Sequence, residues 1–198
     1  LSQVVEVQGS VGHFSIQVKK KPRYVDIDKC IACGTCAQKC PINVKDEFNF
    51  GINKKKAAYI KYDQCVPLKY AIDPSACIYF TFGKCRACEK FCPTGAINFK
   101  QKEETITVTV GAVILAPGFK PFDPSGHDFF GYNTKDVVTS LEFERLLSIS
   151  GPNKGKLLRP SDNTEPKKIA WLQCVGSRNQ NNCGNSYCSN ICCMSAVK

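Results

Sequence analysis

The first twenty residues alternate apolar and polar side chains in a way that predicts two paired strands. Val5 and Val7 come before a Gly-containing segment at residues 9–12, and Ile16 and Val18 come after it. A period of two places the apolar side chains on one face of a strand, and glycines between two such runs favour a tight turn. We therefore predict a β-hairpin at the start of the chain.

Three later segments also carry local patterns. Residues 105–115 are rich in β-branched side chains and predict a strand. Residues 140–147 have helical spacing, and Ser140 is the expected N-cap. Residues 151–166 are rich in Gly, Pro, Asn and Lys, which is typical of a linker or a surface loop.

No segment of the sequence has the form of a membrane span or of a secretory leader. A bilayer needs roughly 20 consecutive apolar residues, and a leader combines a basic start with an apolar stretch. We therefore expect a cytoplasmic protein without a membrane span. The chain begins at Leu1 and stops at Lys198 inside a helix-like run, so we expect a fragment of a larger protein.

The cysteine content is the most informative part of the composition. Fourteen of the 198 residues are Cys. Such a density indicates disulfides, metal sites or redox motifs. Ten of the fourteen fall in three groups at metal-ligand spacing, within residues 30–40, 85–92 and 188–193. Because a disulfide-rich secreted domain is usually short and follows a leader, we favour metal binding.

The first group has the spacing of a bacterial ferredoxin. It follows the pattern C-x2-C-x2-C-x3-C-P from Cys30 to Pro41, in which three thiolates hold one [4Fe-4S] cluster and the fourth serves a second cluster. Gly34 lets the loop approach the cluster without a hindering Cβ atom, and the proline favours an extended Cys40. The spacing predicts a ferredoxin-like module.

A second, wider copy of the pattern follows at residues 77–93. Its first gap has five extra residues within 78–84, which we expect to bulge outward as a surface loop. Crossed ligation assigns cluster one to Cys30, Cys33, Cys36 and Cys92, and cluster two to Cys77, Cys85, Cys88 and Cys40. The alternative is two structural zinc sites, although zinc ribbons pair two Cys-x2-Cys knuckles and need no third Cys or Cys-Pro.

The last group of cysteines follows a short apolar run at residues 168–172. This run predicts a buried strand, with Trp171 in the core. Cys188 and Cys192 are spaced one helical turn apart, so a helix would place both on one side. A third cluster site is therefore a candidate, formed by Cys174, Cys188, Cys192 and Cys193. The alternative is a redox-active thiol group or a set of buried free cysteines.

Four residues with metal-binding or redox side chains lie outside these sets. We expect Cys65 to be a small buried side chain, which is common for free cysteines. Cys183 lies in an Asn-rich loop and is not expected to be a ligand. His13 and His127 lack a partnered spacing and are expected to be ordinary surface or loop residues.

The net charge is +10, which is strongly basic. A cluster bound by four thiolates is a net anion, so part of this excess offsets the cofactors, and we expect no nucleic-acid partner. The runs Lys19–Lys21 and Lys54–Lys56 offer docking surfaces for an acidic partner such as a ferredoxin. The alternative is that they are simply solvated faces, which is commoner for such runs.

Taken in order, several blocks of the sequence resemble the A-type subunit of heterodisulfide reductase. The widened ferredoxin pattern is followed by VGAVILAPGF at residues 110–119 and TSLEFER at residues 139–145. QCVGSR at residues 173–178 and YCSNICCM at residues 187–194 are the most specific blocks. The resemblance covers nearly the whole chain.

The resemblance implies an α+β fold class, in which a two-cluster ferredoxin-like module is inserted in a thioredoxin-reductase-like α/β FAD-binding domain. The implied FAD-binding parts are residues 1–24, which form the hairpin, and residues 101–165. The insert with two [4Fe-4S] clusters is residues 25–100. Residues 166–198 would start a second nucleotide-binding-like domain that contains a cysteine cluster.

The resemblance also implies cofactor contacts beyond the ferredoxin module. It places a third [4Fe-4S] cluster on the four cysteines named above for that site. It places the turn Ala116-Pro117-Gly118 near FAD, where such flavoproteins have Ala-Thr-Gly, so the proline removes a hydroxyl and a backbone donor. No G-x-G-x-x-G occurs in the chain, so we expect the FAD phosphate site to lie outside it.

The implied function is electron transfer between FAD and [4Fe-4S] clusters in an oxidoreductase subunit, including flavin-based bifurcation. The implied partners are B- and C-type subunits, a hydrogenase or formate dehydrogenase module, and ferredoxin. One alternative is a flavin-free ferredoxin-type carrier or adaptor subunit. Others are a related subunit of a ring-reducing acyl-CoA reductase complex and a zinc-stabilised scaffold.

Overall fold

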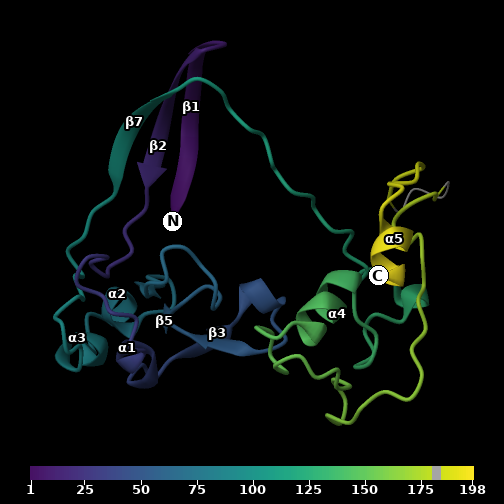
Figure 1. Ribbon diagram of the computed structural model, residues 1–198. Helices are drawn as coiled ribbons and strands as arrows, with labels where there is room; N and C mark the ends of the chain where they lie inside the picture. The colour runs from purple at the N-terminus through teal and green to yellow at the C-terminus, as the bar shows by residue number, and fades with distance from the viewer. Residues whose placement is uncertain (180–183) are drawn as a thin grey trace. The chain divides into compact units, whose positions relative to one another are not determined.

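The computed structural model describes residues 1–179 and 184–198. The chain forms two compact units, Leu1–Ala116 and Pro117–Lys198, and each is described by itself (Figure 1). The fold is mixed, with short helices and strands. Among the described residues, no helix combines the length and the apolar character that crossing a membrane requires.

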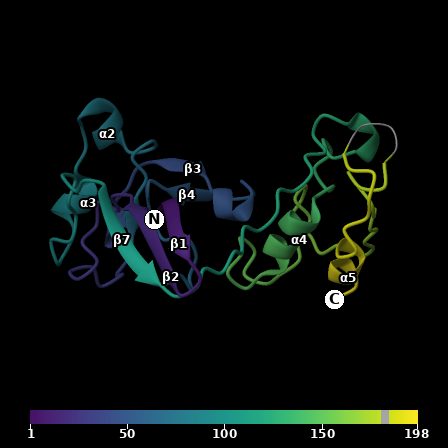
Figure 2. The ribbon, with the colours of Figure 1, turned by 90° about the horizontal axis from the view of Figure 1, so that it is seen from above.

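The N-terminal sheet of the first unit has three antiparallel strands. These are β1 (Ser2–Ser10), β2 (His13–Lys20) and β7 (Glu104–Val110), in the order β1-β2-β7, and they lie side by side in Figures 1 and 2. The predicted hairpin is confirmed. Its turn needs glycine at residue 9, because φ is +107° and a Cβ atom there would lie 2.1 Å from the His13 carbonyl oxygen.

The strand predicted for residues 105–115 is shorter than expected. β7 ends at Val110, which pairs with Phe14 near the start of β2. Beyond that point only the turn of the hairpin is adjacent, where the Gly12 N–H donates to the Gly111 carbonyl, so residues 112–115 have no strand beside them in the described part of this sheet. Ile114 and Leu115 are consequently exposed.

The cysteine-rich part of the first unit is built from short elements around a small core. They are α1 (Thr35–Gln38), β3 (Asn43–Lys45), a 3-10 turn (Glu47–Asn49), β4 (Lys54–Lys56), β5 (Ala58–Tyr59), β6 (Ala71–Ile72), α2 (Ile78–Phe82) and α3 (Ala87–Lys90). The strands pair as β3-β4 and β5-β6. Val25, 1% exposed, bridges to Ile97 and so ties the two ends of this part together.

The extra residues of the second cysteine pattern form a helix, which corrects the prediction of an outward loop. In α2, the Tyr79 and Phe80 rings lie 4.2 and 5.6 Å from the Phe99 ring, and Phe80 lies 4.4 Å from Tyr24. Aromatic side chains at successive helical positions remove much apolar area from water. The insertion therefore contributes to the core, and its end at Phe82 is 75% exposed.

The described residues of the second unit form a 3-10 turn (Asp128–Phe130) and two helices, α4 (Ser140–Leu147) and α5 (Cys192–Val197). The predicted α4 is confirmed, but Ser140 is not its N-cap. Thr139 caps it in a capping box, because its hydroxyl accepts from the Glu142 N–H and the Glu142 carboxylate accepts from the Thr139 N–H. Tyr132 also donates to Glu142, at 2.8 Å.

The buried strand predicted at residues 168–172 does not form in the described part of the unit. Trp171 packs edge-on against Phe143, at 4.8 Å between ring centroids, but stays 45% exposed, and Leu172 is 66% exposed. A short apolar run becomes a buried strand only where other strands pair with it and other elements cover its faces. Those elements are not present among the described residues of this unit.

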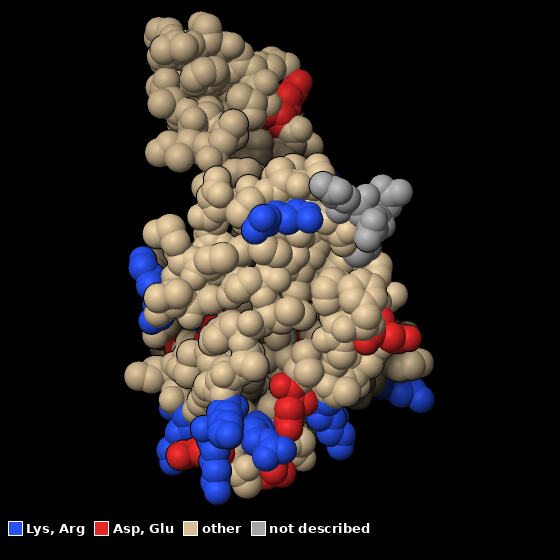
Figure 3. Space-filling model, turned by 90° about the vertical axis from the view of Figure 1, so that its right-hand side faces the viewer, with Lys and Arg blue, Asp and Glu red and all other residues tan. Residues whose placement is uncertain are grey.

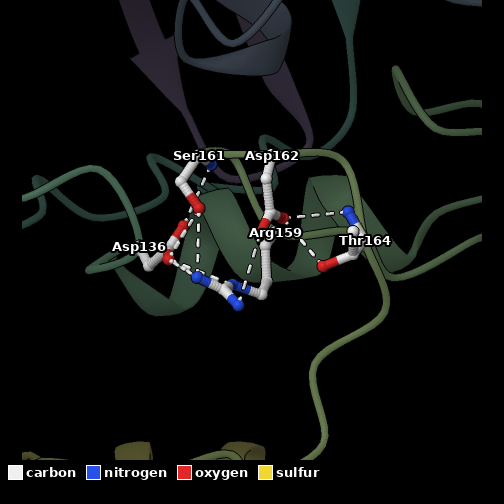
Figure 4. A network of polar contacts seen from close by, with 5 residues as sticks. All are labelled: Asp136, Arg159, Ser161, Asp162 and Thr164. Atoms are coloured by element: carbon white, nitrogen blue, oxygen red, sulfur yellow. Dashed lines mark hydrogen bonds and ion pairs between the residues drawn. The ribbon is translucent and has the colours of Figure 1, made fainter.

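The segment predicted as a linker is held in place by a polar network. Asp136 accepts hydrogen bonds from Arg159 and from both the backbone and the hydroxyl of Ser161, and Asp162 accepts two from Thr164 (Figure 4). The network lies at the surface.

On the face drawn in Figure 3, Lys and Arg gather beside Asp and Glu at one end, and most of the remaining surface is uncharged.

Candidate metal centres

One cavity of the first unit is lined by four cysteines from both halves of the cysteine pattern. Cys30, Cys33 and Cys36 come from the first half, and Cys92 comes from the second half. The space among its lining residues is about 300 Å³ when the open solvent at its mouth is included. These are the four residues predicted from the spacing to hold cluster one.

A second cavity of similar extent, also open to solvent, has the reciprocal composition. Cys77, Cys85 and Cys88 come from the second half of the pattern, and Cys40 comes from the first half. These are the four residues assigned to cluster two. The fold thus exchanges one cysteine between the two halves, as crossed ligation requires.

The two halves position their cysteines with equivalent local structure. Cys36 lies on α1 and Cys88 lies on α3, and these two helices pack against each other. Each helix ends two residues before the cysteine that crosses to the other cavity. The N–H of Cys40 donates to the Ala37 carbonyl, and the N–H of Cys92 donates to the Glu89 carbonyl. The crossing thiols are therefore fixed by the last turn of each helix.

The backbone at Gly34 forms part of the wall of the first cavity and requires glycine. Gly34 has φ +84° immediately before α1, and a Cβ atom there would lie 3.2 Å from the Tyr70 hydroxyl. Both Gly34 and Tyr70 line the cavity. A larger residue would be strained in this backbone conformation and would push on the cavity wall, which agrees with the role predicted for this glycine.

Hydrogen bonds reach several of the sulfurs in the first cavity. The Ala96 N–H donates to Cys92 Sγ at 3.3 Å, and the Thr35 hydroxyl lies 3.4 Å from Cys33 Sγ. The hydrogen bond with Thr35 lowers the pKa of Cys33. Partial burial raises the pKa of Cys92, but the bonds from Ala96 and Thr94 outweigh it, so the net shift is downward. These donors stabilise the thiolate form.

The two cysteines that lie on helices, Cys36 and Cys88, have raised rather than lowered pKa values. Burial raises the pKa of Cys36 to about 12 and the pKa of Cys88 to about 11, and neighbouring thiolates add to both shifts. A buried thiolate needs compensating positive charge, which hydrogen bonds alone do not supply here. Both sites therefore suit a cationic cofactor that replaces the thiol protons.

The arrangement of the cysteines favours a cluster over a single ion. Zinc holds four sulfurs at about 2.3 Å from one point. Among the described residues, no group of three or more His, Cys, Asp or Glu is arranged to hold one metal ion. A [4Fe-4S] cubane is ligated at its four corners by thiolates around it, and four cysteines line each of the two cavities.

The third predicted group lies in the second unit. The charge of Cys192 raises the pKa of Cys193, and Cys174 and Cys188 add to this shift, so all three thiols lie within electrostatic range of Cys193. The helical placement of Cys188 was wrong, because α5 begins at Cys192. Instead, Cys188 lies outside helices and strands, and the Asn190 N–H donates to its Sγ atom at 3.4 Å. This site stays a prediction.

The remaining predicted site residues are not brought into a cavity described above. The turn Ala116-Pro117-Gly118 lies outside helices and strands, and its role near a flavin stays a prediction. Cys65 is partly exposed rather than buried, and its thiol donates to the Pro67 carbonyl at 3.5 Å. Cys183 lies outside the described residues.

Sequence reasoning overlooked the threonines beside the sulfurs. Thr35 follows Cys33 by two residues, and Thr94 follows Cys92 by two residues, with hydroxyls 3.4 and 3.7 Å from the respective Sγ atoms. The repeated Cys-x-Thr spacing was visible in the sequence and is the signal that identifies them.

Comparisons with known proteins agree with this geometry. A family model described as "4Fe-4S binding domain" matches residues 23–46, which contain the first cysteine pattern. The iron-sulfur A-type subunit of CoB–CoM heterodisulfide reductase from Methanocaldococcus jannaschii is 44% identical over 198 residues. The second of the corresponding A-type subunits from Methanopyrus kandleri is 48% identical over the same length.

The name of a third relative includes both heterodisulfide and ferredoxin. It is the A-type subunit of the H(2):CoB-CoM heterodisulfide,ferredoxin reductase of Methanothermobacter thermautotrophicus, which is 41% identical over 198 residues. Each of these three alignments covers 100% of this chain and 29% of the relative. The chain therefore spans less than a third of the length of the curated relatives it matches.

Proposed function

Because the chain is related in sequence, over its whole length, to a part of the A-type subunit of heterodisulfide reductase, we propose that it is an electron-transferring part of an oxidoreductase subunit of this kind. One observation carries the proposal. Two cavities of similar size each gather four cysteines, three from one half of the pattern and one from the other. Structural zinc sites pair two Cys-x2-Cys knuckles and do not require two sites that each take one cysteine from the other.

In this proposal Cys30, Cys33, Cys36 and Cys92 hold one [4Fe-4S] cluster, and Cys77, Cys85, Cys88 and Cys40 hold the other. Such clusters accept and donate single electrons at potentials set by hydrogen bonds and burial. The protein contributes the thiolates, the N–H and hydroxyl donors that face them, and a buried wall. Thr35, Thr94 and Ala96 are the donors in the first cavity, and Tyr70 forms part of its wall.

We extend the proposal to a third cluster on Cys174, Cys188, Cys192 and Cys193. The electrostatic influence of the other three thiols on Cys193 supports it. We also propose that the complete polypeptide binds FAD, with the turn at residues 116–118 beside the flavin. The support for FAD is the family relationship, because the chain contains no phosphate-binding glycine motif.

The names of the relatives suggest the class of partner. They include heterodisulfide, ferredoxin, H(2) and formate as reaction partners of those proteins. We propose that this chain likewise works with catalytic subunits of a heterodisulfide-reductase-type complex and with a ferredoxin. Bifurcation of an electron pair between two acceptors is part of this proposal.

Purification of the full-length protein under anaerobic conditions tests the proposal. We expect iron and acid-labile sulfide in equal amounts and flavin fluorescence in the supernatant after denaturation. Iron and sulfide without flavin would favour the flavin-free carrier. Zinc without sulfide would contradict both and favour the scaffold.

A further inference from the structure

The two lysine runs of the first unit differ in their surroundings. In the hairpin run, Lys19 lies 2.9 Å from Glu103 and Lys20 lies 3.1 Å from Glu104, so strand pairing neutralises much of this run. Exposed ion pairs of this kind are ordinary features of a solvated surface. The hairpin run therefore needs no partner to explain it.

The second run lies on the two-stranded ribbon formed by β3 and β4. Lys45 pairs directly opposite Lys54, and Asn43 pairs directly opposite Lys56. Residues two apart on a strand share a face, so these three lysines project from one face of the ribbon. Like charges directly opposite each other destabilise a strand pair, so Lys45 and Lys54 destabilise the ribbon. An anionic partner bound at this face would offset that repulsion.

The middle lysine of the run points to the other face and has partners there. Lys55 lies 3.5 Å from Glu47 and 4.2 Å from the centre of the Tyr59 ring. In contrast, no acidic side chain of the described residues lies within ion-pair distance of Lys45, Lys54 or Lys56. We call these three residues the ribbon lysines.

One end of this ribbon leads into the wall of the second cysteine cavity. Ile42 directly precedes β3 and Ala57 directly follows β4, beside the Asn43 and Lys56 pair, and both line that cavity. At about 3.3 Å per residue along a strand, Lys45 lies roughly 10 Å along the ribbon from Ile42. A protein held on the ribbon therefore lies roughly 10 Å from residues of the cavity wall, measured along the ribbon.

We propose that the ribbon lysines form a docking surface for an acidic one-electron carrier protein, which exchanges an electron with the second cysteine site. The inference rests on the proposed function, because the carrier needs a redox centre to meet. In one encounter the oxidised partner gains one electron and the reduced partner loses one, and no covalent bond forms or breaks. Clustered carboxylates on the carrier supply the complementary charge, which speeds and orients the encounter.

Binding of an oxidised carrier tests this surface without any electron transfer. The probe is a purified acidic two-cluster ferredoxin, titrated into the full-length protein at low ionic strength and again with added salt. The variant carries Lys45→Gln, Lys54→Gln and Lys56→Gln. The matched control carries Lys154→Gln, Lys156→Gln and Lys167→Gln, three exposed lysines of the second unit with the same change in net charge.

We expect the ribbon variant to bind about tenfold more weakly than the wild type at low ionic strength, and the control to change by less than about twofold. Salt should weaken wild-type binding and should affect the ribbon variant less. Carbodiimide cross-linking of the wild type should join the ribbon lysines to ferredoxin carboxylates. Equal losses in both variants, or no cross-link at this face, would overturn the proposal.

Two measurements separate this inference from the proposed function. Iron and sulfide content of the same preparations reports the clusters, so a loaded protein that ignores ferredoxin overturns the docking surface alone. A preparation without sulfide overturns the docking surface and the proposed function together. If the ribbon lysines instead bind a single-stranded oligonucleotide more tightly than ferredoxin, the assignment of the partner is wrong.

Discussion

The thiols of the two units differ in how the surrounding chain holds them. In the first unit, Cys30 and Cys36 belong to a buried core with Val25, Ile72 and Ile97, even though other cysteines of the cavities reach the surface. The short motif spacing brings three thiols of each set together, and the core around them brings the fourth from the other half of the pattern. Cluster binding there adds to an existing framework.

The thiols of the second unit have no comparable framework among the described residues. Cys188 and Cys193 are exposed, and α5 carries only the last two of the four predicted ligands. The other two lie outside helices and strands, and the apolar run before Cys174 is left exposed. A site of this kind depends on parts of the protein beyond these residues, or on the cofactor itself, for its shape.

The largest expected effect is the loss of one cluster through a cysteine of the other half. Cys92→Ser should remove about four irons and four sulfides and should expose Cys30, Cys33 and Cys36 to alkylation, because Cys92 completes their cavity. Anaerobic iron analysis and mass spectrometry of alkylated peptides measure this. Cys65→Ser is the control and should leave both counts unchanged. Alkylation of Cys77 and Cys85 in place of the first-half thiols would contradict crossed ligation.

A second prediction concerns the core that holds the first unit's thiols. Phe99→Ala should cost about 3–5 kcal/mol in unfolding free energy, because a buried ring in contact with Tyr79 and Phe80 is removed. Phe82→Ala, at the exposed end of α2, should cost less than about 0.5 kcal/mol. Denaturant unfolding of the loaded protein compares them. A loss of unfolding free energy at Phe99 as small as that at Phe82 would show that the contacts of α2 with Phe99 do not stabilise the core.

A third prediction concerns the local order of the second unit. Thr139→Ala should destabilise α4 by about 1 kcal/mol, because the capping box is lost. Ser140→Ala should have an effect within about 0.5 kcal/mol. Thermal unfolding followed by circular dichroism measures both. A larger loss of stability from Ser140→Ala than from Thr139→Ala would show that Ser140 is the N-cap, as expected from the sequence.

The smallest predicted effect is a pH dependence of the surface network in the second unit. Hydrogen bonds from Ser161 and then Arg159 lower the pKa of Asp136, and the Thr164 N–H lowers the pKa of Asp162. A lowered folded-state pKa gives stabilisation that is present above the ordinary value of 3.8 and is lost as pH falls through the lower one. The Ser161 and Thr164 amide signals should therefore shift only below pH about 3.8. A transition near neutral pH would contradict the network.

The sequence predicted those parts of the molecule whose structure depends on near neighbours. The hairpin follows from alternation and glycine, and the two sets of four cysteines that line the cavities follow from motif spacing. The helix at residues 78–82 was not predicted, because the standard ferredoxin spacing has no residues at the insertion. The aromatic residues of the insertion, which pack into the core, were visible in the sequence. Sequence patterns also put the N-cap of α4 one residue late, because Thr139 and Ser140 are both good caps.

The other failures have a different cause. The run at residues 168–172 and the strand expected to continue past Val110 are apolar on both faces, and such runs become buried strands only beside other strands. No such strands lie beside them in the described parts of the chain, so both runs stay exposed. The helical position of Cys188 was wrong because spacing alone does not fix where a helix begins.

The central claim is that eight cysteines of the first unit hold two iron-sulfur clusters. The most direct test compares the iron and acid-labile sulfide of the full-length protein with those of the Cys36→Ser, Cys88→Ser double variant, both prepared without oxygen. We predict that the variant loses about eight irons and eight sulfides per chain. Loss of about two zinc ions, with no sulfide in either preparation, would contradict the account.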